Sequence, residues 1–196
     1  MAIRRLWLTL GVAIAVLSAA PSRAASGNVA SATGLASATV IQPIAVAEIA
    51  DLDFGNVASD GAGLIGAGSV NVATTTPGAT YAGASRNACD TGLDCPLPHA
   101  ARFVVSGEAH RAYVITVPSE IAITPHPIAG DLTSGNATLV IDGIVVRTTS
   151  RANDGPAGQL DANGADSFDI GGRLQLPAGL APARYSTVIR VVVAYS

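Results

Sequence analysis

Apolar and polar residues alternate over much of the chain, and this alternation is typical of β-strands with one buried face. The clearest case is the segment from Tyr185 to Tyr195, with Ser186, Arg190 and Ala194 on one side. Every second position is occupied by Tyr185, Thr187, Ile189, Val191, Val193 and Tyr195, so one face is apolar. Only Ser196 follows, so this strand cannot pair with a later one. Its register must come from strands far upstream or from another chain. We therefore expect a partner-binding edge strand with these core-side residues: Tyr185, Ile189, Val191, Val193 and Tyr195.

Shorter apolar runs predict further strands. Residues 103–107 and 113–118 flank a polar turn and are typical of a hairpin, and residues 138–141 and 144–146 flank the turn dipeptide Asp142-Gly143. Other strands are expected within residues 39–49, which Pro43 interrupts, and within 121–124 and 168–176. Residues 64–74 are expected to form a twisted or bulged hairpin. Residues 75–100 and 150–166 are rich in turn-forming residues and are expected to be loops. About eight strands with frequent turns predict an all-β, immunoglobulin-like or pilin-like antiparallel β-sandwich.

The first 24 residues have the three parts of a secretory signal peptide. Arg4 and Arg5 precede an apolar run over residues 6–20, and Ser22-Arg23-Ala24 supplies the small residues of a cleavage site before Ala25. An anchoring helix is the alternative, but the run is shorter than the roughly 20 residues of a membrane span and ends at a proline. We expect a mature protein that is exported to the periplasm, cell surface or extracellular space, with no membrane span after cleavage.

The mature chain is expected to have two parts. Removing 24 of the 196 residues leaves 172, enough for one domain with its own core. Residues 25–38 are small and polar and are expected to form a flexible N-terminal extension, a possible donor strand. Residues 39–196 are expected to form the sandwich. The net charge of −3 argues against a nucleic-acid partner, which would need a basic surface.

The chain has two cysteines, Cys89 and Cys95, separated by five residues. In an oxidising compartment so close a pair predicts a disulfide. The alternative is a redox or metal-binding pair, which would favour C-x-x-C spacing and further ligands, and only His99 is near in sequence.

No sequence motif predicts catalysis. Asp90-Thr91-Gly92 spells the tripeptide of aspartic proteases, but that chemistry needs two such carboxylates and the chain has one copy. His99, His110 and His126 stand apart in the sequence, without a catalytic motif around them. The carboxylates of Asp161–Asp169 suggest a calcium loop, yet their spacing departs from an EF-hand, and a solvated turn is the simpler interpretation. We expect no enzyme activity, cofactor or metal.

Several segments in a fixed order resemble a known family. They are Leu52-Asp53-Phe54-Gly55, residues 103–107, residues 113–118, residues 172–177 and residues 182–185 leading into the tyrosine-ended strand. Together they resemble the exported bacterial DUF4402 domain over about Thr39 to Tyr195, and are similar to spore-coat-protein-U-like domains and to subunits of archaic chaperone–usher pili. The resemblance implies an incomplete immunoglobulin-like sandwich, held by a periplasmic chaperone and completed by the N-terminal extension of the next subunit.

A donated strand needs alternate side chains large enough to fill a groove. In this extension Val29 and Leu35 are the bulky residues, and the alternating set is Ala30, Ala32, Gly34, Ala36 and Ala38. That set would fill a groove poorly, so Val40 and Ile41 would have to contribute.

The sequence leaves two candidate functions. One is a structural, fimbria- or pilus-like surface subunit that assembles by β-strand complementation. The other is a free-standing secreted binding module, for carbohydrate or another surface ligand. A sugar-binding module normally offers exposed aromatics, and the chain's one tryptophan, Trp7, lies in the signal peptide. This favours the structural subunit.

Overall fold

The computed structural model describes residues 31–58, 66–91, 96–126, 137–181 and 183–196. Residues 31–39 contain no helix or strand and are exposed. The compact unit runs from Val40 to Ser196 and consists of strands and one short 3₁₀ helix. Within the described ranges no helix is long and apolar enough to cross a membrane.

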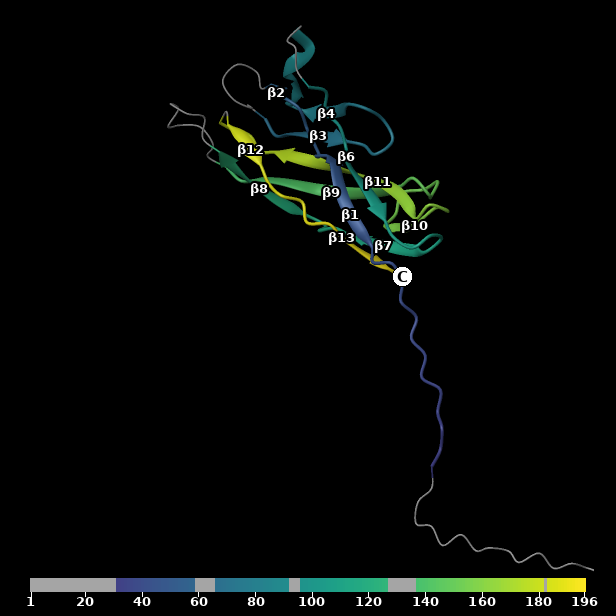
Figure 1. Cartoon of the computed structure of the whole chain (residues 1–196). Helices are drawn as coiled ribbons and strands as arrows, with labels where there is room; N and C mark the ends of the chain where they lie inside the picture. Colours follow the sequence, from purple (N-terminus) through teal and green to yellow (C-terminus); the bar gives the residue numbers. More distant parts are fainter. Residues whose placement is uncertain (1–30, 59–65, 92–95, 127–136, 182) are drawn as a thin grey trace, which may run out of the picture. The chain divides into compact units, whose positions relative to one another are not determined.

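The large sheet is antiparallel and centres on the longest strand, β11 (Ala165–Leu176) (Figure 1). One side of β11 pairs with β9 (Leu139–Thr148) along most of its length. Its other side pairs with β6 (Ala101–Ser106) in the first half and with β3 (Gly68–Val72) in the second. Beyond these lie β1 (Ala45–Ala50) next to β6, β4 (Ala79–Gly83) next to β3, and β8 (Ile121–His126) followed by β12 (Arg184–Ser186) next to β9.

A smaller sheet has the order β10 (Ala157–Gln159), β7 (Ala112–Thr116), β13 (Val192–Tyr195). A two-stranded ribbon pairs β2 (Val57–Ala58) with β5 (Arg86–Asn87), and η1 (Ala88–Thr91) follows it. The described residues thus contain thirteen strands rather than about eight, because several strands of two to five residues lie in segments without a clear alternation.

The strand order is that of an immunoglobulin-type fold. Such a fold has strands A, B, E and D in one sheet and C, F and G in the other. Here the first four places are taken by β1, β6, β11 and β9, and β7 and β13 take the places of C and F. The predicted all-β antiparallel sandwich is confirmed.

The core has two contiguous clusters. One is built on β3, β8, β9 and the end of β11, with Leu139, Ile141 and Leu174 buried. The other lies between the two sheets, where Phe103 and Phe168 stack at 5.0 Å between ring centroids and pack with Tyr113 and Ile115. Alternate residues of β6 and β7 are buried.

The expected hairpins are wrong. The strands at residues 103–107 and 113–118 are not partners: β6 pairs with β1 and β11, whereas β7 pairs with β10 and β13. Both strands contribute to one core cluster from opposite sheets, since Phe103 and Ile115 bury their side chains in it. The turn at residues 108–111 therefore connects the two sheets.

The second expected hairpin, at Asp142-Gly143, is one continuous strand with a bulge. Gly143 has a φ of 56°, which glycine adopts readily, and the register against β11 shifts there. The extra residue changes which positions face inward, so that Ile141 and Val146 are both buried. In the described part of residues 64–74 there is likewise one strand, β3, which pairs with β4 further along the chain. The two expected loops are also partly wrong, since 75–100 contains β4 and β5 and 150–166 contains β10.

Candidate partner-binding edge

The terminal segment is two strands, not the single strand that the alternation predicts. β12 pairs with β8 in the large sheet, residues 187–191 form no strand, and β13 pairs with β7 in the small sheet. The partner segment is interrupted at the same level, between Thr116 and Ile121, where Pro118 has no N–H to donate. The terminal segment thus follows its bent partner from one sheet to the other.

The alternation of faces persists through this break. The predicted core-side residues are all half-buried, and they pack against the two core clusters: Tyr185, Ile189, Val191, Val193 and Tyr195. Residues between them are exposed, including Val188 at 87% and Val192 at 51%. The core-side residues are thus only partly covered, unlike those of β6 and β11.

The outer edge of this segment has no strand partner among the described residues. β12 pairs only with β8 and β13 only with β7 in that part of the chain, and β1, at the corresponding edge of the other sheet, pairs only with β6. In a complete immunoglobulin domain strand G pairs with F at this position. β1 is itself poorly covered, with Val46 40% and Ile49 63% exposed. The sandwich is therefore open along this side, which we call the open edge.

Tyr195 ties one end of the open edge together. Its hydroxyl accepts a hydrogen bond from the Glu108 N–H at 2.7 Å and donates one to the Gln42 carbonyl at 2.8 Å. The Arg111 guanidinium lies 5.5 Å from the ring centroid, a cation–π distance. Gly107 leaves room for this hydroxyl, since a Cβ there would collide with it. One side chain thus joins β13 to the β6–β7 turn and to the segment that precedes β1.

A buried tyrosine ties the small sheet to the large one. Tyr113, fully buried on β7, donates a hydrogen bond to Asp166 Oδ2 of β11 at 2.7 Å. Asp166 also accepts hydrogen bonds from the Ser150 hydroxyl at 2.5 Å and the Ser167 N–H at 2.8 Å. Burial, with the hydrogen bond to this carboxylate, raises the pKa of Tyr113 far above its usual value.

The outer face of the large sheet, which points away from the small sheet, carries ion pairs. Arg102 and Asp169 form a two-bond ion pair between β6 and β11, and Arg173 and Asp142 form another between β11 and β9. The hydrogen bonds from Arg173 and Gln175 lower the pKa of Asp142. These pairs place polar groups on this face, whereas Val104 of β6 and Val145 of β9 are each 38% exposed.

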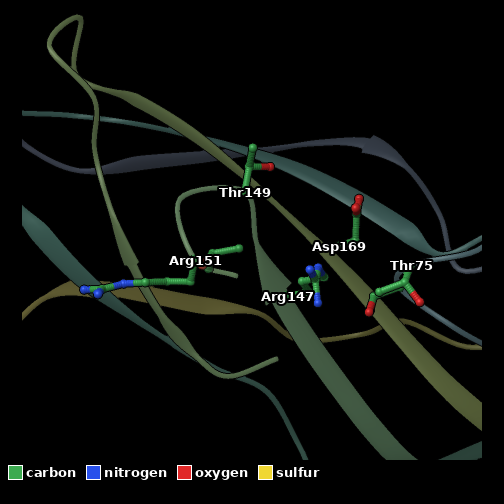
Figure 2. A pocket seen from close by; sticks show the side chains of 7 residues that line it. Thr75, Arg147, Thr149, Arg151 and Asp169 are labelled. Carbon is green, nitrogen blue, oxygen red and sulfur yellow. The ribbon is translucent and has the colours of Figure 1, made fainter. Parts of the chain in front are cut away.

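A shallow hollow of about 330 Å³ lies on this face, lined by Thr74, Thr75, Arg147, Thr148, Thr149, Arg151 and Asp169 (Figure 2). Arg147 binds Asp154 and the Ala152 carbonyl, and Asp169 binds Arg102, so these charges have partners within the domain. No aromatic side chain lines the hollow.

The structure does not bring the acidic loop together as a metal site. The Asp161 carboxylate accepts hydrogen bonds from the N–H groups of Ala165 and Asn163, which lower its pKa. Asp166 and Asp169 are engaged by Tyr113 and by Arg102. Over the described ranges no three acidic, histidine or cysteine side chains converge as metal ligands. The carboxylates therefore stabilise turns and strand contacts.

Of the two cysteines, Cys89 lies within the described residues and Cys95 does not. Cys89 lies in η1, where its N–H donates to the Asn87 side chain at 3.0 Å. The disulfide stays a prediction. The signal peptide, residues 1–24, and residues 25–30 of the extension likewise lie outside the described residues.

The fold and the open edge define an immunoglobulin-like sandwich with one exposed edge. The chain belongs to the family described as Domain of unknown function (DUF4402), whose model matches residues 44–195, from just before β1 to the end of β13. Neither a curated protein nor a solved structure matches the chain significantly.

Proposed function

We propose that this protein is an exported structural subunit of a fimbria- or pilus-like surface fibre, and that it assembles by accepting a β-strand from a partner at the open edge. It carries out no catalysis in this role. The observation that supports the proposal is the terminal segment. There a backbone edge without a strand partner in the described part of the chain coincides with a half-buried row of apolar side chains.

An added strand would satisfy the unpaired backbone groups of the open edge and cover its apolar side chains at the same time. An edge strand presents unpaired N–H and C=O groups that another strand can satisfy. A strand beside β13 would also cover Val191, Val193 and Ile189, and each 100 Å² of apolar surface removed from water would stabilise the complex by roughly 2.5 kcal/mol. Main-chain hydrogen bonds would supply affinity, and the side-chain positions would supply specificity.

The partners follow from export and from the family resemblance. A periplasmic chaperone would cover the open edge before assembly, and like subunits would be the neighbours in a fibre. The sequence of residues 1–24 supports export, which places the protein in the periplasm, at the cell surface or outside the cell.

Purification of the mature protein, residues 25–196, tests the proposal. Alone it should be unstable or self-associate, and with a cognate chaperone it should form a one-to-one complex. A variant without residues 25–38 should still bind the chaperone, because the open edge lies elsewhere. A stable, monodisperse monomer with cooperative unfolding, unchanged by the deletion, would contradict strand complementation.

That result would favour the second candidate, a free-standing secreted module that binds carbohydrate or another surface ligand. The hollow of Figure 2 is the feature that supports it, because threonine hydroxyls and arginine side chains can hydrogen-bond a polar ligand. The hollow has no aromatic lining on which a sugar ring could stack. We therefore rank it below the fibre subunit.

A further inference from the structure

We propose that the natural occupant of the open edge is a strand from a different polypeptide, with Val, Ile or Leu at alternate positions, and not the N-terminal extension of another copy of this chain. The inference rests on the proposed strand complementation and names the partner. It follows from what the open edge exposes, what the extension contains and where the chain is anchored.

The open edge requires bulky side chains. The core-side residues Ile189, Val191 and Val193 occupy alternate positions of the terminal segment, and each is half-buried. A strand laid beside them would place every second side chain over the gap between the sheets. Small side chains there would leave voids, whereas branched ones would bury further apolar surface.

The extension has the wrong alternation for this task. Its uniformly apolar face consists of Ala32, Gly34, Ala36 and Ala38, all exposed and small. In an extended strand the bulky Val29 and Leu35 would both lie on the opposite face, with Ser31, Thr33, Ser37 and Thr39. If Leu35 pointed into the open edge, four hydroxyl side chains would point in with it and lose their hydration.

The bulky residues that follow the extension are held by their own domain. The Gln42 carbonyl accepts a hydrogen bond from the Tyr195 hydroxyl, and Ile44 packs against the core cluster between the sheets. Ile41 is therefore one residue from an anchored position and Val40 two residues. Neither can extend along the open edge of another molecule while Tyr195 holds residue 42.

The remaining occupant is a strand of another protein with bulky apolar residues at alternate positions and no charge on that face. The extension of a different subunit of the fibre is the occupant that we infer. This chain would then accept a strand well and donate one poorly, as a subunit at the end of a fibre does.

Two synthetic peptides test the inference. The first has the sequence of residues 26–41, and the second is the same peptide with Ala32→Ile, Gly34→Val and Ala36→Ile, which leaves its length and charge unchanged. The mature protein is refolded from denaturant with each peptide, and soluble yield and peptide affinity are measured by size exclusion and fluorescence anisotropy. A third peptide carries Ser31→Ile, Thr33→Val and Ser37→Ile, on the opposite face.

The second peptide should bind at least about 100-fold more tightly than the first, since each extra buried methylene favours binding by roughly fourfold. It should also bind more tightly than the third, which tests the face. Equal affinity for the first and second peptides would overturn the inference while leaving strand complementation intact. Binding by none of the three would overturn both.

Discussion

The hydrogen bond between Tyr113 and Asp166 should be a large single contribution to the stability of the domain. Tyr113→Phe keeps the buried ring and removes only the hydroxyl that donates to Asp166 at 2.7 Å. A hydrogen bond to a charged group contributes about 1.5–3 kcal/mol, and Asp166 retains the Ser150 and Ser167 donors. We therefore expect a loss of about 2 kcal/mol.

For a domain of this size that loss corresponds to a fall in Tm of about 4–8 °C. Urea unfolding monitored by circular dichroism measures the loss of unfolding free energy. The protein is used in its soluble form, alone or with a bound partner strand. In an Asp166→Ala background the same Tyr113→Phe change should cost less than about 0.5 kcal/mol, because the acceptor is already absent. A loss below about 0.5 kcal/mol in the wild-type background, or an equal loss in both backgrounds, would refute the assignment.

The same tyrosine gives a prediction at alkaline pH. Burial raises the folded-state pKa of Tyr113 above its unfolded value of about 10, so the neutral form is favoured in the folded state. Its contribution is fully present below pH 10 and is lost as the pH rises further, because the unfolded chain then releases a proton that the folded chain retains. Unfolding free energy measured from pH 9 to 11 should fall, and it should fall less steeply in Tyr113→Phe. Parallel curves would contradict this.

Three further predictions concern the open edge and the cysteines. Val191→Asp places a charge against a half-buried apolar position and should cost about 1–3 kcal/mol, whereas Arg190→Ser, on the exposed side, should cost less than about 0.5 kcal/mol; equal unfolding midpoints would refute the assigned faces. Gly107→Ala should destabilise by about 1–3 kcal/mol by displacing the Tyr195 hydroxyl, with part of the loss absent in a Tyr195→Phe background; a full loss in both would show that another contact is responsible. Thiol titration of the denatured, unreduced mature protein should detect no free thiol, and detection of both would rule out the disulfide.

The alternation of residues along the chain predicted the fold class and the faces of the terminal segment. Alternation is a local property, because successive side chains of a strand point to opposite sides whatever the strand pairs with. It therefore identified Val191 and Val193 as core-side residues of the terminal segment.

Tertiary structure alone decided which strands pair and where the chain changes sheet. Asp142-Gly143 has the local chemistry of both a hairpin turn and a bulge, and pairing of the whole strand with β11 selects the bulge. The contacts of Tyr195 with Gln42 and Glu108 join residues 153 and 87 positions apart, and no local pattern encodes them. The open edge depends on the same long-range pairing, because a strand lies at an edge only when the other strands pair elsewhere.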